Sequence, residues 1–227
     1  MWIYTKKYYI FVTLDWLIFI IWYNEVMIEK IVKGAFFTNT YIISKENKCI
    51  IVDPGLGFEG AANEIKAKYQ VEAILITHGH IDHIDGIRYF DCPIYIHKDD
   101  EVNLYDSDLS LYSMMRMKTP FKKGNLNIIT VYDGYEFELL GYNFKVLHTP
   151  GHTRGSVCYS YSSKVLSGDT LFKSSCGRTD FPTGNPSNMR MSLKKIITTY
   201  PDNYSVYPGH DEKTTIKDEK KYNPYIK

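Results

Sequence analysis

The sequence predicts one mixed α+β domain over residues 27–227, and three observations support this. Short β-rich runs bounded by turn residues recur along the stretch. Segments whose apolar residues have helical spacing lie between some of these runs. Neither an internal repeat nor a low-complexity linker divides the stretch, and a chain of 227 residues is long enough to bury one sizeable core.

The predicted strands are short apolar runs that end in glycine, proline or polar residues. The turn Asp53-Pro54-Gly55, for example, closes the run 49–52. Polar residues 45–48 separate two neighbouring runs and indicate a hairpin. The expected strands are 41–44, 49–52, 73–76, 94–96, 127–131, 136–139, 144–147, 156–161, 164–166 and 204–207.

Helices are predicted at 58–69, where apolar residues have helical spacing, and at 84–90 and 187–200. A polar cap followed by proline supplies a start signal for the last of them. The polar segment 98–126 is expected to form a helix and a long loop, and such loops often build the wall of a site. Its three methionines are interpreted as packing residues; these are Met114, Met115 and Met117.

Composition and charge favour a globular protein that acts on small molecules. Hydrophobic residues make up 44% of the chain and charged residues 23%, which is ordinary for a globular domain. The formal net charge is +1, so electrostatics supplies no argument for a nucleic-acid partner or an anionic membrane surface. The four cysteines form no CxxC pair, which predicts reduced thiols in a cytoplasmic protein. None of these properties indicates an oligomeric state.

Residues 1–26 differ from the rest of the chain because they contain an apolar run of sixteen residues, 8–23. A membrane span needs about 20 such residues, and Asp15 within the run would cost roughly 2.5–3.5 kcal/mol in a spanning helix. Three interpretations stay open: an artefact of an upstream start codon with Met27 as the real start, an N-terminal anchor, or an extra helix packed on the domain. Membrane association is expected only for the anchor.

The motif HGHIDH directly follows an apolar, strand-like run and predicts a metal site. Side chains alternate along a strand, so a strand that ends in a turn can aim His78 and His80 the same way. Asp82 and His83 then come from the turn and can face a second ion. Four metal-competent side chains within six residues are hard to explain as surface polarity.

Three further ligand types stand where predicted strands end, namely His152, Asp169 and His210. Glycine or proline stands beside each of them, which lets the backbone turn tightly and approach an ion. Imidazole nitrogen and carboxylate oxygen suit Zn²⁺, with Fe and Mn as alternatives. Seven ligands are too many for one tetrahedral zinc but fit two divalent ions that share a carboxylate. His97 and His148, also at strand ends, are interpreted as structural.

This arrangement resembles the metallo-β-lactamase superfamily over about residues 28–226. The matching positions, together with the turn at Asp53, are His78, His80, Asp82, His83, His152, Asp169 and His210. The resemblance implies an αββα sandwich with its metal site at one edge between two mixed sheets. It implies that His78, His80 and His152 hold one ion. Asp82, His83 and His210 would hold the other. Asp169 would bridge the two ions, and Asp53 would support the site.

Residues 168–172 and 176–181, and likewise 207–210 and 214–216, resemble glyoxalase II and related hydrolases. This implies hydrolysis of a thioester, such as a hydroxyacylglutathione, by hydroxide that the metal ions supply. Asp82 would orient the hydroxide or accept its proton. Arg178 would contact a carboxylate of the substrate, with a structural salt bridge as the alternative. Glu212 stands where glyoxalase II has a tyrosine, so the thiol carrier and the acyl group stay open.

Two other functions stay open at the level of sequence. A persulfide dioxygenase with one iron shares the fold, the HxHxDH run and a stretch like 176–181. One iron per chain and oxygen consumption with a persulfide would identify that enzyme. A degenerate member of the superfamily that only binds a ligand is the non-enzymatic alternative, which the complete set of seven ligand types disfavours.

Overall fold

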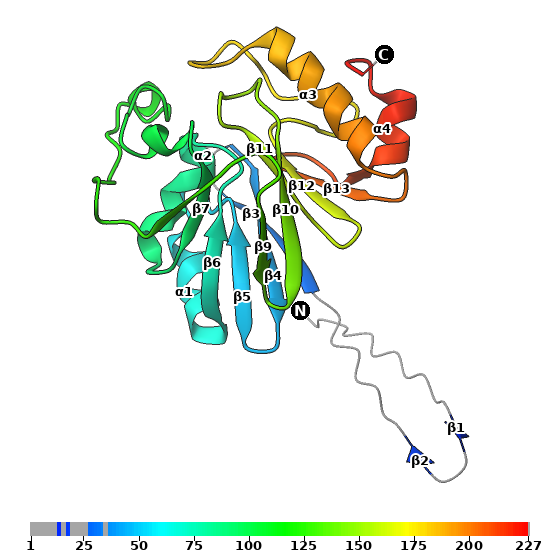
Figure 1. Cartoon of the computed structure of the whole chain (residues 1–227). Coiled ribbons are helices and arrows are strands. Elements are labelled where there is room, and N and C mark those ends of the chain that lie inside the picture. Colours follow the sequence, from blue (N-terminus) through cyan, green and yellow to red (C-terminus); the bar gives the residue numbers. More distant parts are fainter. Residues whose placement is uncertain (1–12, 15–16, 19–26, 34–35, 227) are drawn as a thin grey trace.

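Two six-stranded sheets pack face to face, and helices cover their outer faces (Figure 1). The computed structural model describes residues 13–14, 17–18, 27–33 and 36–226. The layers follow the order helix, sheet, sheet, helix, so the predicted αββα sandwich is confirmed. The predicted mixture of strand directions is also confirmed, because each sheet contains both parallel and antiparallel neighbours.

The first sheet is built from six strands of the N-terminal half, which are β3 (Met27–Lys33), β4 (Thr38–Lys45), β5 (Lys48–Val52), β6 (Gln70–Leu75), β7 (Ile94–His97) and β8 (Ile128–Val131). They lie in sequential order across the sheet. β3, β4 and β5 are antiparallel neighbours, whereas β5 to β8 run parallel. Parallel strands end at a common edge, and the HGHIDH motif follows one of them there.

The second sheet is built from the C-terminal half, by β9 (Glu136–Leu139), β10 (Tyr142–His148), β11 (Val157–Tyr161), β12 (Lys164–Gly168), β13 (Ser205–Pro208) and β14 (Thr214–Thr215). Its order is β14-β13-β12-β11-β10-β9. β12 and β13 pair in parallel, and the other neighbours are antiparallel. The ends of β12 and β13 therefore lie side by side, and each precedes a candidate ligand.

Three buried apolar clusters hold these layers together. Side chains from the inner faces of both sheets form the central cluster, in which Leu75 is fully buried. Helix α1 (Glu59–Lys68) packs Ile65 into a cluster with the first sheet. Helix α3 (Pro186–Thr199) packs Leu193 into a cluster with the second sheet. Each helix thus buries one apolar stripe, as its sequence spacing predicts.

The segment 98–126 differs from its prediction. It contains turns and two short 3₁₀ helices, η2 (Glu101–Leu104) and η3 (Ser113–Met115), in place of the one helix expected there. A polar segment without a continuous apolar stripe gains too little burial to hold an α-helix against a sheet. The interpretation of its methionines as packing residues was also wrong, because all three side chains are exposed, Met114 by 64%.

Several other elements were missed or shifted. The strands β3 and β14 and the helix α4 (Ile216–Tyr222) were not predicted. The side chain of Thr215 caps α4 by accepting a hydrogen bond from the backbone N–H of Asp218, which is a start signal that the sequence contains. The helix expected at 84–90 is two short helices, α2 (Ile81–Ile84) and η1 (Asp85–Tyr89).

The three interpretations of residues 1–26 concern a segment that lies largely outside the described residues. Within it, β1 (Thr13–Leu14) and β2 (Leu17–Ile18) pair as short antiparallel strands. Among the described residues, none of the helices has the length and apolar character needed to cross a membrane. The interpretations of this segment therefore stay predictions.

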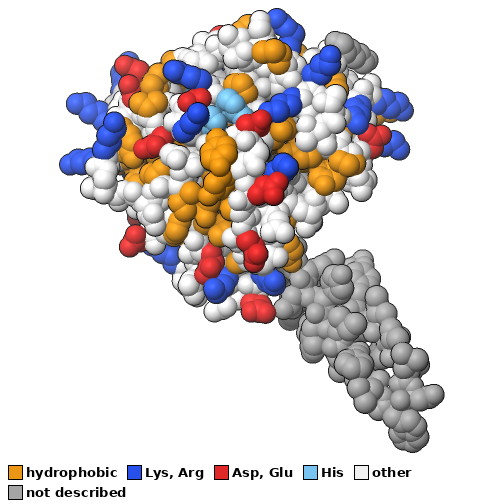
Figure 2. Space-filling model, in the orientation of Figure 1, with side chains coloured by type: hydrophobic (Ala, Val, Ile, Leu, Met, Phe, Trp, Pro, Cys, Tyr) orange, Lys and Arg blue, Asp and Glu red, His pale blue; other side chains and the backbone are white. Residues whose placement is uncertain are grey.

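Surface charge is mixed on the face that Figure 2 presents. Basic and acidic side chains are interspersed across it, and hydrophobic side chains gather in a band near its centre. On the part of this face that is described, charges of one sign form no extended patch. This face therefore adds no electrostatic argument for nucleic-acid binding.

Candidate metal centre

The HGHIDH motif spans the change from strand to helix after β6. His78 and His80 lie in the connecting loop, whereas Asp82 and His83 lie in α2. His80 immediately precedes the helix and has an extended backbone, with φ −86° and ψ 151°. The loop and the first helical turn thereby present four side chains within six residues to one edge of the sandwich.

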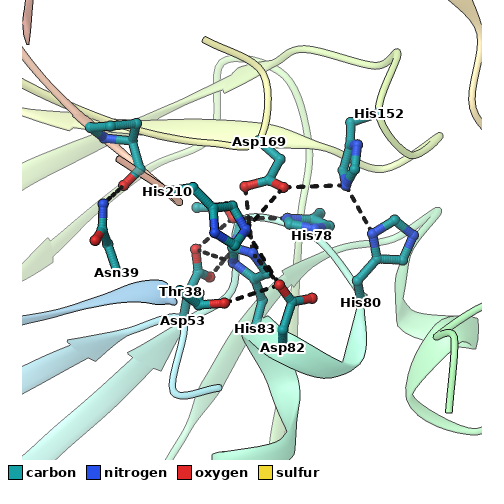
Figure 3. A network of polar contacts seen from close by, with 12 residues as sticks. Thr38, Asn39, Asp53, His78, His80, Asp82, His83, His152, Asp169 and His210 are labelled. Carbon is teal, nitrogen blue, oxygen red and sulfur yellow. Dashed lines mark hydrogen bonds and ion pairs between the residues drawn. The ribbon is translucent and has the colours of Figure 1, made fainter. Parts of the chain in front are cut away.

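His152, Asp169 and His210 reach the same edge from the second sheet. They follow β10, β12 and β13 respectively, and all seven side chains converge in Figure 3. Gly209 lies against Asp169, because a Cβ atom there would be 2.2 Å from Asp169 Oδ1. Only glycine permits this close approach, so the sequence places His210 directly after the residue that allows it.

Three buried histidines form the first ligand group, which contains His78, His80 and His152. His80 Nδ1 lies 2.9 Å from His152 Nε2. One ring nitrogen of His78 lies within 4.8 Å of a ring nitrogen of each of the other two. Three imidazole nitrogens that face one point form a set that suits a single divalent ion.

Asp82, His83 and His210 form the second ligand group. His210 Nε2 lies 3.3 Å and His83 Nε2 lies 3.6 Å from Asp82 Oδ2. Asp169 lies between the two groups: its Oδ1 is 3.4 Å from His83 Nε2, and its Oδ2 is 3.5 Å from both His152 Nε2 and His210 Nε2. The structure thus brings all seven candidates together, with one carboxylate shared by both groups.

Buried atoms that lack hydrogen-bond partners show that this cluster suits cations. Within the described residues, His78 Nε2, His83 Nε2 and Asp169 Oδ1 are buried and have no hydrogen-bond partner. Such atoms cost free energy unless something binds them. Nitrogen and carboxylate donors are the set that Zn²⁺, Fe and Mn accept, so the residues present fit a pair of divalent ions.

The carboxylates and histidines of the cluster shift one another's pKa. Burial alone would lower the pKa of His83, but nearby carboxylates, Asp82 foremost, raise it to about 9. Burial also acts to lower the pKa of His210, yet hydrogen bonds to Asp169 and Asp82 raise it to about 11. By contrast, burial lowers the pKa of His80 to about 3. The two carboxylates, Asp82 and Asp169, thus favour positive charge at the cluster, which protons or metal ions can provide.

Outer contacts fix the direction of the histidine rings. Asp53 Oδ2 lies 3.0 Å from His83 Nδ1, which leaves His83 Nε2 facing the cluster. Asp53 is itself held by Thr77, whose backbone N–H and hydroxyl donate to it at 2.8 and 2.7 Å. His152 Nδ1 lies 2.7 Å from the carbonyl oxygen of Arg178, which leaves His152 Nε2 for an ion. Contacts of this kind fix the tautomer and orientation of metal-binding histidines.

Two further residues support the cluster and were missed in the sequence. Thr38 Oγ1 donates to Asp82 Oδ2 at 3.0 Å. The buried carboxylate of Asp100 accepts from Gly79 N, Gly155 N and Thr153 Oγ1 at 2.7–2.9 Å, so it ties the HGHIDH loop to the loop of His152. No local pattern identifies either residue, because their partners lie 21 to 55 positions away along the chain.

A cavity of about 470 Å³ opens onto the cluster. Arg178 lines it, but its Nε and Nη2 each donate to a carboxylate oxygen of Asp180 at 2.6 Å. The guanidinium also lies 4.0 Å from the centre of the Phe181 ring. The structure therefore contains the salt bridge that was the alternative for Arg178, and a role in substrate binding stays a prediction.

His97 and His148 lie outside the seven-residue cluster, as expected, but they are not isolated. Their rings stack with centroids 4.1 Å apart and planes inclined by 10°. Asp99 lies beside them, with Oδ2 3.8 Å from His97 Nδ1. Parallel rings do not aim their in-plane lone pairs at a common point, so this arrangement gives a stacked pair and leaves the structural interpretation in place.

Sequence comparisons agree with this geometry. A family model described as the metallo-beta-lactamase superfamily matches residues 34–210. A Streptococcus pyogenes protein named a probable metallo-hydrolase is 34% identical over 219 residues, covering 91% of this chain and 94% of its own length. A Haemophilus influenzae protein named hydroxyacylglutathione hydrolase GloC is 30% identical over 212 residues, covering 88% and 97%.

Solved structures give the same result. The BLEG-1 B3 metallo-beta-lactamase superposes with a TM-score of 0.80 at 32% identity, covering 88% of this chain and 99% of its own. TTHA1623, solved in a di-iron-bound form, superposes with a TM-score of 0.74 at 30% identity, covering 87% of this chain and 99% of its own. ETHE1 from Myxococcus xanthus superposes with a TM-score of 0.70 at 28% identity, covering 87% of this chain and 83% of its own. The chain therefore belongs to the metallo-β-lactamase superfamily.

Proposed function

We propose that this protein is a dinuclear metal-dependent hydrolase of thioesters, similar in reaction to hydroxyacylglutathione hydrolase. The observation that carries the proposal is the pair of three-residue ligand groups that share Asp169 and open onto a cavity. The relative named hydroxyacylglutathione hydrolase supports the thioester class of substrate. We propose Zn²⁺ as the metal, with iron as the alternative in view of the di-iron-bound neighbour.

The residues of the chain have separate tasks in this reaction. Bound divalent ions supply acidity, because they lower the pKa of a coordinated water to about 7 and polarise a carbonyl. Asp82 lies at the cavity wall, and both Thr38 Oγ1 and His210 Nε2 contact its Oδ2, at 3.0 and 3.3 Å. These contacts fix the carboxylate, so Asp82 can orient the attacking water or accept its proton.

The lining of the cavity meets the needs of a thioester, whose leaving group requires no acid beyond the metal cluster. A thiol has a pKa near 8.5, so thiolate leaves without a proton from a strong general acid. An amine leaving group needs such a proton. Among the described residues that line the cavity, Arg178 is the one titratable side chain outside the metal cluster, and it is paired with Asp180. The cavity therefore presents no separate acid for an amine.

A persulfide dioxygenase is the second candidate function. The observation that favours it is the similarity to ETHE1 from Myxococcus xanthus. One iron would occupy one ligand group only, whereas here Asp82, His83 and His210 form a second compact group beside Asp169. The stoichiometry of bound metal separates the two candidates: two ions per chain support the hydrolase, and one iron per chain supports the dioxygenase.

Substitution of Asp82 tests the proposed hydrolase directly. The full-length protein is loaded with Zn²⁺, and hydrolysis of S-lactoylglutathione and of acyl thioesters of N-acetylcysteamine is followed by thiol release. We expect Asp82→Ala to lower kcat/KM by about 10²-fold or more, in line with removal of a positioned acid–base group. Asp108→Ala removes an exposed carboxylate outside the cavity and serves as the matched control.

The metal content of each variant must be measured together with its rate, since Asp82 is also a candidate ligand. Elemental analysis of the wild type should give two ions per chain. Normal turnover by a folded Asp82→Ala protein would remove Asp82 from the mechanism. A wild type that hydrolyses no thioester while binding two metal ions would remove the proposed substrate class.

A further inference from the structure

We infer that the cavity beside the metal centre receives an apolar arm of the thioester, and that a carboxylate-bearing carrier such as glutathione is disfavoured. The inference rests on the proposed thioester hydrolysis and names the substrate class of that same site. The arm is an aliphatic or aromatic group, which belongs either to the acyl half or to the thiol half of the substrate. In either half, the cavity would bind the arm in the same way, by burying its apolar surface.

The walls of the cavity carry the first argument. Apart from the metal cluster, Gly177 and Arg178, all of its lining side chains are apolar; they are Phe36, Ile81, Leu111, Met114, Met115, Phe172 and Phe181. Phe181 lies edge-on to His80, with ring centroids 5.6 Å apart, and Phe172 lies edge-on to His210 at 5.9 Å. Apolar side chains thus flank both ligand groups, and a volume of about 470 Å³ is in the range of small-molecule sites.

Charge at the cavity carries the second argument. Arg178 is the one lysine or arginine among the described lining residues, and Asp180 already accepts both of its forked donors. Lys173 follows the lining residue Phe172, and it is paired with Glu212 in turn. A glutathione thioester brings two carboxylates, which would compete with these partners for the two cations. An apolar arm meets no such competition.

Exposed apolar surface at the cavity carries the third argument. Met114 and Met115 lie in η3 with 64% and 40% of their surface exposed, and Phe36 is 40% exposed. Contiguous apolar side chains exposed to water commonly mark binding surfaces. Methionine is flexible and polarisable, so it adapts to ligands of irregular shape. The exposed apolar side chains line the same cavity as the metal centre. The group that covers them is therefore expected to be part of the substrate.

A panel of thioesters tests the inference on the full-length, Zn²⁺-loaded protein. It compares acetyl, butanoyl and octanoyl thioesters of N-acetylcysteamine, the acetyl thioester of thiophenol, and S-lactoylglutathione. One buried methylene corresponds to about a fourfold change in affinity. Because the cavity is open, we expect kcat/KM to rise by at least about tenfold from acetyl to octanoyl. The thiophenol ester reports whether the apolar arm lies on the thiol side instead.

Binding without turnover supplies a second readout. S-octyl and S-ethyl N-acetylcysteamine are thioethers that cannot be hydrolysed, and calorimetry should show at least about tenfold tighter binding of the octyl compound. Equal binding of the two thioethers, or S-lactoylglutathione as the best substrate of the panel, would overturn the inference and leave the proposed function intact. Hydrolysis of no thioester would remove the proposed function, while the thioethers still report on the apolar site.

Two variants locate the effect in the cavity. Met114→Ser should lower the ratio of octanoyl to acetyl kcat/KM by about threefold or more. Met191→Ser is the matched control, since Met191 is 63% exposed on α3 and does not line the cavity. Asp180→Asn should free the guanidinium of Arg178 and raise kcat/KM for S-lactoylglutathione relative to the octanoyl ester. An unchanged ratio in both Met114→Ser and Asp180→Asn would refute the assigned walls.

Discussion

Asp53 determines which nitrogen of His83 faces the metal centre. Its Oδ2 lies 3.0 Å from His83 Nδ1, and Thr77 holds the carboxylate through two hydrogen bonds. The Asp53 backbone has φ 52°, a left-handed conformation that aspartate and asparagine tolerate better than most residues. Asparagine at this position therefore preserves the backbone and removes the charge.

Asp53→Asn should weaken binding of the second metal ion by about 10- to 100-fold, because the outer partner of a metal-binding histidine raises its basicity and fixes its orientation. Metal content after dialysis against graded concentrations of a chelator measures the effect, with circular dichroism as a check on folding. Asp108→Asn is the control for loss of an exposed carboxylate. Retention of both ions at wild-type chelator concentrations would contradict this role for Asp53.

At the scale of elements, the HGHIDH loop is held by its packing against η2. A Cβ atom on Gly79 would lie 2.5 Å from Asn103 Cβ, so the loop backbone touches the 3₁₀ helix directly. Asp100, which immediately precedes η2, accepts hydrogen bonds from Gly79 N and Gly155 N. The segment 98–126, although it lacks an α-helix, therefore positions two loops that carry metal ligands.

Gly79→Ala should destabilise the protein by about 1–3 kcal/mol, because the added methyl group overpacks this contact. Gly60→Ala is a matched control: Gly60 lies in α1, and a Cβ there meets nothing within 4 Å. Alanine at that position should stabilise the protein by about 0.4–1 kcal/mol through a lower entropy of the unfolded chain. Urea unfolding of both variants measures the difference, and equal midpoints would show that the loop can move away from Asn103.

At the scale of the whole molecule, the sandwich concentrates ionisable groups at one edge, so its stability depends on pH and metal together. Without metal ions, His83 and His210 have raised pKa values of about 9 and 11. A raised histidine pKa contributes stability below the unfolded value near 6.5, and this contribution is lost as pH rises through the folded pKa. Burial lowers the pKa of His80 to about 3 and that of His97 to about 4. These two histidines therefore contribute stability at higher pH, and that contribution is lost as pH falls.

The melting temperature of the metal-free protein should therefore peak near pH 6.5. It should fall toward pH 9 as His83 loses its proton, and fall toward pH 4 because the unfolded chain binds protons that folded His80 and His97 exclude. Bound Zn²⁺ takes the place of the protons on His83 and His210, so the decline between pH 6.5 and 9 should vanish in the loaded protein. Calorimetry across this range with and without chelator measures both curves, and a metal-free curve that rises toward pH 9 would refute the assignment.

The αββα arrangement was implied by the family resemblance. The sequence by itself determined the mixed α+β fold class, most strand positions and the seven candidate ligands. These features are local: an apolar run, a turn residue and a ligand type stand next to one another, as in residues 73–83. Period-two alternation and glycine or proline at strand ends need no distant partner in order to be recognised. That local character explains why His152, Asp169 and His210 could be proposed individually.

The family resemblance implied how those ligands divide into two groups, whereas only the tertiary structure decided what surrounds them. Asp100 and Thr38 were missed because their partners lie far away in the sequence. The exposure of Met114 depends equally on its folded surroundings. A hydrogen bond or a cavity wall requires two segments at a definite distance, and packing of the two sheets sets that distance. Residue types and their spacing in the sequence do not set that distance.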